Sequence, residues 1–578
     1  MSVITVENLR YRYPHAKELA LDGLDFSVEK GEFIGIIGEN GAGKSTLSQA
    51  LMGLVPQFYK GAYGGTVMVD GIEAGRTPVA QLCGHVGLVF QNPFNQLSGA
   101  KDNVYEEVAF GMQNLGVPAE EMKNRVEEAL KLLDIWQYRD RNPFDLSGGQ
   151  MQRVAIASVL VMRPDVMILD EPTSQLDPEG SDEVFKAVET LTGSGITILM
   201  IEQKIEKLAA YCDRILLLHK GKQIAFDTPQ KVFSMPDLNN YGIQAPAFTR
   251  ICKAEGVTLA DGTYPVTVEE AAGVLREKRL EASACADGGE YAQRAAGAEA
   301  AQAGGPAESA GSSDEQFCIE KLDFSYLADV PVLKNLNMKL DKRPTAIIGQ
   351  NGAGKTTLVK LLKGLLKPVS GSIYFHGEDI SGKTVAMLAG NVGYVFQNPD
   401  DQIFKYNVMD EILFGPLNIG MDAERAKKEA ERALKLTGLT GKEKENPYDL
   451  ELYERKMTAI ASVLAMDTDV LILDEPTIAQ DWKGRQIIGG IIRSLSERGK
   501  LVIAILHDMD FVAENFERVI IMAHGQVLAD GTAKEVFAQE EALKKARLQK
   551  PYVMQLCEAL GYEKSYLTVE ELLKDQVS

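Results

Sequence analysis

The sequence has no hydrophobic run long enough to cross a membrane, and its cysteines are few and scattered. Its most apolar stretches, 196–201 and 470–473, are far shorter than the roughly 18 residues that a membrane span needs. The six cysteines form no CxxC pair and no zinc-type Cys/His spacing, which fits a reducing compartment without disulfides. The first residues, MSVITVENLRYRYP, lack the basic and then apolar pattern of a secretory signal. These absences predict a chain that stays in the cytoplasm.

Basic residues are in the minority. There are 61 Lys and Arg against 82 Asp and Glu, a net charge of -21, and we find no local run of Lys or Arg. This balance repels a phosphate backbone and argues against a general nucleic-acid-binding protein. The composition, 45% hydrophobic and 25% charged, is that of a globular protein. At about 150 residues per domain, 578 residues predict three to four units rather than one core.

The chain is a tandem repeat, in which the same segments return in the same order. GENGAGKST at 38–46 returns as GQNGAGKTT at 349–357. VFQNP returns at 395–399, and VMILDEPTSQLD at 166–177 returns as VLILDEPTIAQD at 470–481. The tails also repeat, because each has a Pro, a Cys six residues later and then TVEE. A repeat of this kind must be settled before any fold is assigned.

Five units follow from the repeat. In each half an apolar strand, a Gly-rich turn and a helix precede apolar strands that alternate with amphipathic helices, which predicts an α/β fold with a mostly parallel sheet. Residues 281–314 are mostly Ala, Gly, Ser and Glu, and we expect a disordered tether there, although an Ala-rich helix is the alternative. The predicted boundaries are two α/β domains at 1–232 and 315–536, helical extensions at 233–280 and 537–578, and the linker at 281–314.

Each half contains the phosphate-loop pattern GxxxxGK[ST] after an apolar strand and at the start of a helix. Glycines let successive backbone N–H groups turn toward a phosphate, and the helix N-terminus adds its positive dipole end. We expect Lys44 and Lys355 to reach the β and γ phosphates, and Ser45 and Thr356 to ligate Mg²⁺. The other predicted nucleotide-binding positions are Gly38, Asn40, Gly41, Gly43 and Thr46 in the first loop, and Gly349, Asn351, Gly352, Gly354 and Thr357 in the second.

Two further motifs place charge and donors near these loops. VMILDE and VLILDE predict a buried strand that delivers two carboxylates to the sheet edge where ligands bind. Asp170 and Asp474 would hold Mg²⁺, and Glu171 and Glu475 would polarise the attacking water. LSGGQ, just before a helical run, predicts a second anion site at Ser147, Gly148, Gly149 and Gln150.

Taken together, the phosphate loops, VFQNP, LSGGQ and LDEPT resemble those of the ATP-binding-cassette ATPases, over nearly the whole of both halves. The resemblance implies that ATP is bound between two cassettes arranged head to tail, with one cassette's phosphate loop facing the other's LSGGQ. It also implies that Gln91 and Gln397 contact Mg²⁺, and that Tyr13 and Tyr326 stack on adenine. For the two tyrosines, a place in the core is the alternative.

The two halves are not equivalent. Asp145 and Asp449 align at a constant offset of 304 residues, so the second signature is LELYE, in which Glu451 replaces the serine and Leu and Tyr replace the glycines. His507 occupies the position of the family's switch histidine, and Gln203 lies opposite it in the first half. With head-to-tail pairing, both departures fall in the site built on the first phosphate loop. We therefore expect one hydrolytic site (Glu475, His507) and one slow site (Glu171, Gln203).

The segments that follow VFQNP, together with the tails, resemble the energy-coupling-factor importer ATPases. That resemblance implies a separate transmembrane scaffold, a separate substrate-binding membrane subunit and a place on the cytoplasmic face of the membrane, while the expectation of no nucleic-acid partner rests on the acidic charge balance. The transported solute would be a vitamin, a vitamin precursor or a metal ion, and segments 95–107 and 400–411 would dock on the scaffold. Two alternatives stay open, a tandem-cassette sugar or peptide importer ATPase and a soluble tandem-cassette translation factor.

Overall fold

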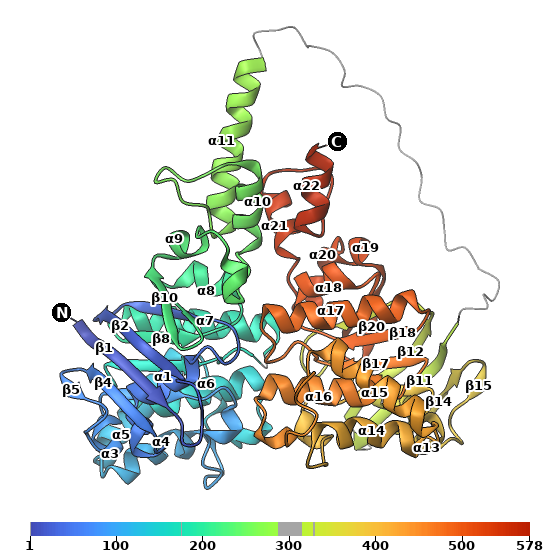
Figure 1. The fold of residues 1–578 in the computed structure, drawn as a ribbon, viewed down its shortest axis with the longest axis horizontal. Coiled ribbons are helices and arrows are strands. Elements are labelled where there is room, and N and C mark those ends of the chain that lie inside the picture. The colour runs from blue at the N-terminus through green and yellow to red at the C-terminus, as the bar shows by residue number, and fades with distance from the viewer. Residues whose placement is uncertain (1, 175, 287–314, 328–329, 578) are drawn as a thin grey trace.

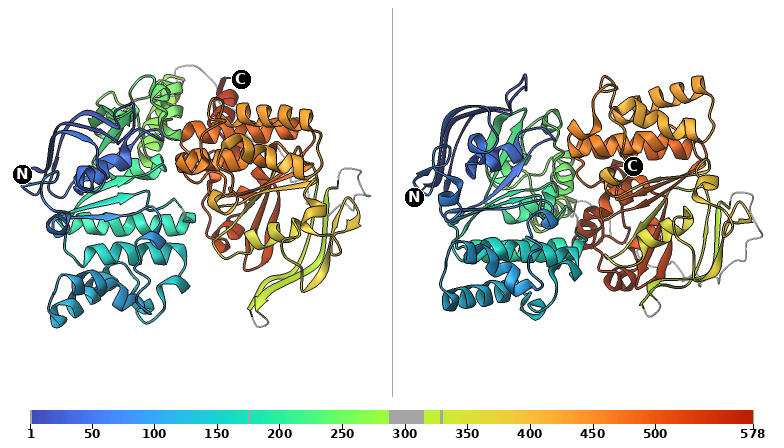
Figure 2. Two further views of the ribbon diagram at one scale, coloured as in Figure 1. Left: turned by 60° about the horizontal axis from the view of Figure 1, so that its bottom comes forward. Right: turned by 90° about the horizontal axis from the view of Figure 1, so that it is seen from below.

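The computed structural model describes residues 2–174, 176–286, 315–327 and 330–577. The two halves of the chain form two similar units side by side, and the C-terminal part of each half rises at one end of the molecule (Figure 1). Two further views show the same pairing of a blue-to-green half with a yellow-to-red half (Figure 2). The tandem repeat expected from the sequence is thus also a repeat in three dimensions.

Each half opens with a four-stranded antiparallel sheet. The strand orders are β2-β1-β4-β5 and β12-β11-β14-β15, which are the same arrangement. Alternate residues of these strands are buried, as expected for a sheet with one face on the core. The bounds are β1 (Ser2–Arg12), β2 (Leu21–Glu29), β4 (Ala62–Val69), β5 (Ile72–Glu73), β11 (Phe317–Leu327), β12 (Val330–Leu340), β14 (Ser370–Phe375) and β15 (Glu378–Asp379).

A six-stranded sheet forms the centre of each half. Its orders are β10-β9-β3-β8-β7-β6 and β16-β17-β18-β13-β19-β20, parallel except for the last hairpin. Short apolar runs such as FIGII and TILMI are buried along their whole length, as in sheets covered on both faces. The first sheet comprises β3 (Phe33–Ile37), β6 (Val86–Val89), β7 (Val166–Asp170), β8 (Thr197–Ile201), β9 (Arg214–His219) and β10 (Lys222–Asp227); the second comprises β13 (Thr345–Ile348), β16 (Val392–Val395), β17 (Val470–Asp474), β18 (Leu501–Ile505), β19 (Arg518–Ala523) and β20 (Gln526–Thr532).

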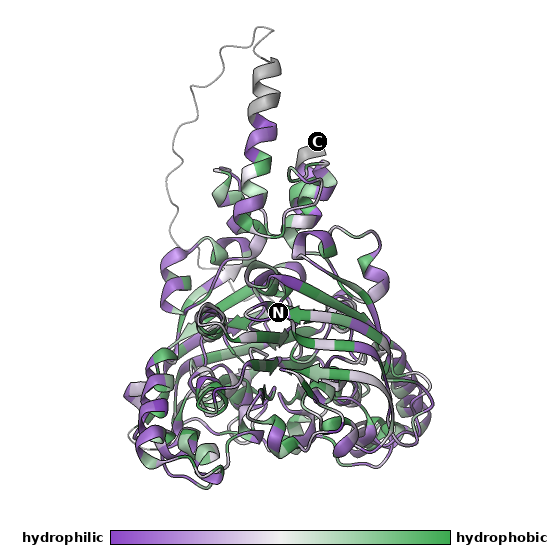
Figure 3. Cartoon of the chain, turned by 90° about the vertical axis from the view of Figure 1, so that its left-hand side faces the viewer, coloured by the Kyte–Doolittle hydropathy of each residue, from purple (hydrophilic) through white to green (hydrophobic). Residues whose placement is uncertain are grey.

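Helices cover both faces of the central sheets, which confirms the predicted α/β fold. Figure 3 shows the inner strands as largely hydrophobic and the outer helices as mixed. The first half has α1 (Lys44–Leu51), α2 (Leu54–Gln57), α3 (Val79–Leu82), α4 (Val104–Asn114), α5 (Ala119–Leu132), α6 (Gly148–Leu160), α7 (Pro178–Gly193) and α8 (Ile205–Tyr211). The second has α12 (Lys355–Leu362), α13 (Val385–Leu388), α14 (Val408–Asn418), α15 (Ala423–Thr437), α16 (Leu452–Leu464), α17 (Trp482–Glu497) and α18 (Met509–Asn515).

The two C-terminal extensions pack on each other and share one core. Phe248 and Ile251 from the first extension are buried in one cluster with Val553, Leu556 and Cys557 from the second. The sequence predicted a helical extension after each domain, and in the structure the apolar faces of the two extensions cover one another. The helices are α9 (Pro229–Phe233), α10 (Ala247–Glu255), α11 (Val268–Ala286), α19 (Ala533–Phe537), α20 (Glu540–Lys545), α21 (Tyr552–Ala559) and α22 (Val569–Val577).

Two of the predicted domain boundaries fall inside helices of the structure. The boundary at 232 falls inside α9, and the boundary at 536 falls inside α19. Helix α11 continues to Ala286, past the start of the predicted tether at 281, and the rest of that tether lies outside the described residues. Within the described ranges, none of the helices combines the length and the apolar character that crossing a bilayer requires.

Candidate active site

The two phosphate loops have the same conformation at the ends of β3 and β13. In each, a glycine with left-handed backbone precedes the helix, with φ of 98° at Gly43 and 96° at Gly354. A side chain at Gly43 would meet a backbone carbonyl at 2.5 Å, so this turn requires glycine. Lys44 and Lys355 are buried, and each donates to the carbonyl of the first glycine of its own loop, at 2.8 and 2.7 Å. Both loops thus present a lysine and a helix N-terminus at the same sheet edge.

The aspartates that end β7 and β17 lie beside the loop hydroxyl groups. Thr356 Oγ1 is 3.4 Å from Asp474 Oδ1. Ser45 acts on Asp170 from the equivalent place and opposes the rise of its pKa. Burial is the main cause that raises the pKa of both aspartates. Hydroxyl and carboxylate oxygens are the hard ligands that Mg²⁺ prefers, so both pairs fit the predicted metal position.

In the second half, Glu475 is held at both carboxylate oxygens. Gln397 Nε2 donates to Oε2 at 2.9 Å, and His507 Nε2 lies 3.1 Å from Oε1. Burial raises the pKa of Glu475, but the contact with His507 and the nearby ammonium groups of Lys355 and Lys456 outweigh burial, so that the pKa lies below its usual value. This geometry brings together the three predicted residues in a form suited to accept a hydrogen bond from water.

In the first half, Glu171 has two amides as partners. Gln91 Nε2 donates to Oε2 at 2.7 Å, and Gln203 Nε2 donates to Oε1 at 2.8 Å. Burial raises the pKa of Glu171 to about 7, with Lys44 opposing and Asp170 adding to the rise. The two glutamates therefore have similar contacts but different electrostatic surroundings, because an amide stands where the other site has an imidazole.

Each phosphate loop touches the segment after LDEPT in the other half. Asn40 N donates to Asp481 Oδ2 at 3.0 Å, and Asn351 N donates to Asp177 Oδ2 at 3.1 Å. Lys483 also pairs with Glu39 across the same boundary, at 2.6 Å. These contacts between residues more than 170 positions apart place the halves face to face (Figure 2).

The two signature segments begin equivalent helices but face different surroundings. Ser147 caps α6 and, with Gln150, forms a capping box, while Glu451 takes the cap position of α16. Glu451 Oε1 lies 3.5 Å from where a Cβ would stand at Gly41 of the first phosphate loop. At Gly352 of the second loop, no atom of the described residues lies within 4 Å of that position. A carboxylate thus faces the first loop, and among the described residues no hydrogen bond joins the predicted anion site at Ser147, Gly148, Gly149 and Gln150 to the second loop.

Comparison with known proteins identifies the family. A family model described as "ABC transporter" matches residues 21–174 and 333–478, that is, the core of each half. The chain belongs to the ABC transporter family. It is an ATP-binding protein with two tandem nucleotide-binding domains, and ABC transporter ATP-binding proteins are ATPases.

Relatives of similar length support this assignment. A putative ABC transporter ATP-binding protein of Caldanaerobacter subterraneus subsp. tengcongensis is 38% identical over 99% of this chain and 98% of its own length. One from Methanosarcina acetivorans is 36% identical over 99% of this chain and 92% of its own. Among solved structures, CbiO1 from Clostridium perfringens, described as part of the ABC transporter complex CbiONQ, is 36% identical, with 42% of this chain and 99% of that chain covered and a TM-score of 0.36.

The tyrosines predicted to stack on adenine lie beside the phosphate-loop helices of this ABC protein. Tyr13 is half-buried, and its hydroxyl is 3.2 Å from Thr46 Oγ1 and 2.9 Å from Gln49 Oε1. Tyr326 is 59% exposed, with its hydroxyl 3.3 Å from Thr357 Oγ1. Both rings are therefore near the nucleotide loops, and the exposed Tyr326 is not a core residue.

A cavity of about 210 Å³ lies between the halves. Glu171 and Gln203 line it from one half, and Glu475 and His507 line it from the other. The two ABC sites therefore open into one space, which the linear sequence does not reveal.

Two contacts of the second site were missed from the sequence. Tyr394 donates to Asp474 Oδ2 at 2.8 Å, and its signal is a lone hydroxyl in the apolar strand VGYV. Lys456 Nζ contacts main-chain carbonyls of the site, and the sequence carries no local signal for this, because Lys456 directly follows the charged residues Glu454 and Arg455.

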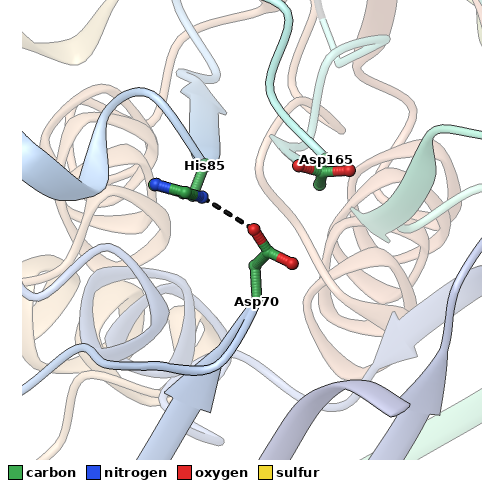
Figure 4. A group of neighbouring side chains, drawn as sticks. All are labelled: Asp70, His85 and Asp165. Carbon is green, nitrogen blue, oxygen red and sulfur yellow. Dashed lines mark hydrogen bonds and ion pairs between the residues drawn. The ribbon is translucent and has the colours of Figure 1, made fainter. Parts of the chain in front are cut away.

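Asp70, His85 and Asp165 cluster at the other end of the first central sheet (Figure 4). His85 Nδ1 is 2.7 Å from Asp70 Oδ2, and Asp165 is paired with Lys30 at 2.6 Å. His85 and Asp165 precede β6 and β7, whereas the phosphate loops follow the strand ends. This cluster is therefore separate from the ATP sites and already contains a cation in Lys30.

Proposed function

We propose that this chain is the energy-coupling ATPase subunit of a membrane importer of the energy-coupling-factor type, with one hydrolytic and one slow ATP site. The observation that carries the asymmetry is the carboxylate of Glu451 opposite Gly41. A γ-phosphate bound in the first loop would meet this negative charge where a normal signature offers a serine and backbone donors. Among the described residues, no carboxylate stands at the equivalent place beside Gly352 of the second loop.

The second site has the groups that hydrolysis needs. Glu475 would orient and polarise the attacking water, and His507 would hold the carboxylate and contact the γ-phosphate. Lys355 would bind the β and γ phosphates, and Ser147 from the other half would complete the site. Glu171 and Gln203 hold equivalent positions in the slow site, where a raised pKa leaves Glu171 partly protonated at neutral pH.

Mg²⁺ would be held by hard oxygen ligands in both sites and would neutralise charge on the β and γ phosphates. Its protein ligands would be Ser45, Gln91 and Asp170 in the first site, and Thr356, Gln397 and Asp474 in the second. Each glutamine donates to its glutamate through the amide nitrogen, so the amide oxygen points elsewhere and suits a cation.

Exposed aromatic side chains support docking on a membrane scaffold. In the first half, Phe94 and Phe144 stack with ring centroids 5.9 Å apart. In the second, Phe404 packs on Phe414 at 4.6 Å, and the nearby Tyr406 is 83% exposed. Phe94 directly precedes segment 95–107, and Phe404 and Tyr406 lie within segment 400–411. Helices α4 and α14 lie at the end of the molecule opposite the C-terminal extensions (Figure 1). Paired apolar patches of this kind are typical of protein interfaces. Docking would place the chain on the cytoplasmic face of the membrane.

The hydrolytic assignment is tested with the full-length purified chain. We expect Glu475→Gln to lower ATPase turnover at least about 100-fold and Glu171→Gln to lower it less than about 3-fold. Equal losses would contradict the asymmetry.

The membrane assignment is tested by tagging the chain and purifying it from detergent-solubilised membranes. Integral membrane subunits should co-purify with the tagged chain, and the double variant Phe94→Ala, Tyr406→Ala should no longer retain them. A ribosome-associated, membrane-free chain would favour the translation-factor alternative, and recovery of a sugar or peptide permease would favour the other importer class.

A further inference from the structure

The second half buries a lysine where the first half has a glutamine. Lys456 and Gln152 are each the seventh residue after the matched aspartates Asp449 and Asp145, and both are 1% exposed. They therefore occupy equivalent places on α16 and α6. Removing an ammonium group from water is costly unless strong partners replace the water. The buried lysine of the second half therefore needs acceptors close to its ammonium group.

Those partners are main-chain carbonyls of the second ATP site. Lys456 Nζ donates to Gln397 O at 2.9 Å and to Glu475 O at 2.5 Å. The same two residues are joined by their side chains, because Gln397 Nε2 donates to Glu475 Oε2. One ammonium group thus connects α16, the end of β17 and the loop after β16. Burial lowers the pKa of Lys456 to about 8, and the carboxylates of Glu475 and Asp474 oppose this fall.

The first half lacks this connection. Within the described residues, Gln152 Nε2 has no hydrogen-bond partner. The buried cation of α6 is the next residue, Arg153, which contacts Leu133 O at 3.1 Å and Glu183 at 2.9 Å. In the second half that next residue is Met457. The buried cation of the second helix therefore stands one position earlier than that of the first helix. Only the cation of the second half contacts the main chain of Glu475.

We propose that Lys456 is a positioning residue of the second ATP site, which fixes the backbone of Glu475 relative to that of Gln397. This inference rests on the proposed role of Glu475 in hydrolysis. Each glutamate is contacted by a glutamine, and the side-chain contacts differ in that His507 touches Glu475 where Gln203 touches Glu171. The clamp that Lys456 forms with the two main-chain carbonyls is a second difference, and it fixes the backbone pivot from which the Glu475 carboxylate extends. A displacement of about 1 Å at such a pivot is enough to lower a rate strongly.

The test is steady-state ATPase activity of the full-length chain carrying Lys456→Gln. Glutamine suits this place on the helix, because the first half has it there. We expect kcat to fall about 10-fold or more while the KM for ATP changes less than about 2-fold, since the clamp does not touch the nucleotide loop. Lys456→Arg, which keeps a cationic donor, should retain more of kcat than Lys456→Gln. Gln152→Met is the matched control, with kcat within about 2-fold of the unchanged chain.

The outcomes separate this inference from the proposed function. If Glu475→Gln abolishes turnover while Lys456→Gln keeps kcat within about 2-fold, the positioning role is wrong and the proposed site remains. A loss in Lys456→Gln that lies wholly in KM also overturns it. If Glu475→Gln retains turnover, the proposed function itself fails. Thermal unfolding verifies that each variant is folded; should Lys456→Gln not fold, Lys456→Met is assayed by the same criteria.

Discussion

Asp177 accepts a hydrogen bond from the backbone N–H of Asn351, although the two residues lie in different halves of the chain. The carboxylate divides its two oxygens: Oδ1 caps α7 at Gly180 N, and Oδ2 reaches the second phosphate loop. Asp481 does the same for α17 and the first loop. Each phosphate loop is thus contacted by a helix cap of the opposite half, and we expect hydrolysis at one loop to depend on the position of the other half.

Asp177→Ala should therefore affect activity more than Asp481→Ala. Asp177 contacts the loop of the proposed hydrolytic site, and Asp481 contacts the loop of the slow site. We expect turnover to fall about 10-fold in the first variant and less than about 3-fold in the second. Both lose one cap and one contact between halves, so each is the stability control for the other. A larger loss in Asp481→Ala would contradict the assignment of the sites.

Restoring the first site should restore its turnover. In a Glu475→Gln background, where the second site is silent, we expect Glu451→Ser, Leu452→Gly and Tyr453→Gly combined with Gln203→His to raise ATPase activity at least about 10-fold. The changes remove the carboxylate opposite Gly41 and supply an imidazole to Glu171. Gln203→His alone is the control. No gain from the combined variant would show that the slow site is limited by something other than its signature and switch residue.

Asp510 predicts a pH-dependent stability. Burial, with Asp508 and Glu206 adding, raises its pKa well above 3.8 in the folded chain, although Tyr552 N and Arg485 oppose this. The folded state therefore binds this proton more tightly than the unfolded state, and the stability that the group contributes below about pH 4 is lost as the pH rises.

Asp510→Asn should remove this loss while it keeps an oxygen to accept from Tyr552 N. We expect its unfolding midpoint at pH 8 to exceed that of the unchanged chain by about 2 °C, with the difference vanishing near pH 4. Asp401→Asn, at an exposed carboxylate, should show no difference at either pH. A lower midpoint for Asp510→Asn at pH 8 would mean that the Asp510 charge is stabilising.

The shared core of the C-terminal extensions should contribute to stability as one unit. Leu556→Ala leaves a cavity at a fully buried position between the two extensions, which costs about 2–5 kcal/mol. Ile251→Ala, in the other extension, should shift the same unfolding transition. Glu563→Ala, at an exposed position nearby, should change stability by less than about 0.5 kcal/mol. Two independent transitions for the two extensions would contradict a common core.

Most of each ATP site could be predicted from the sequence because its groups are contiguous. A phosphate loop, a strand ending in Asp and Glu, and a signature each occupy fewer than about ten residues, and their chemistry follows from residue type. The α/β fold followed from the alternation of apolar strands and helices. Glu451 could be recognised as a departure because the repeat supplies its own reference.

What the sequence could not reveal depends on partners that have no sequence signature. Lys456 binds carbonyl oxygens, which every residue has, so no motif identifies Gln397 and Glu475 as its acceptors. The contact between Asp177 and Asn351 depends on how two halves face each other, and the common core of the extensions depends on which apolar faces meet. The sequence alone determined that there are two phosphate loops and that one signature is altered. That the altered signature faces the first loop was expected only through the family resemblance, and the tertiary structure places it there, because this requires residues about 400 positions apart to be brought within contact.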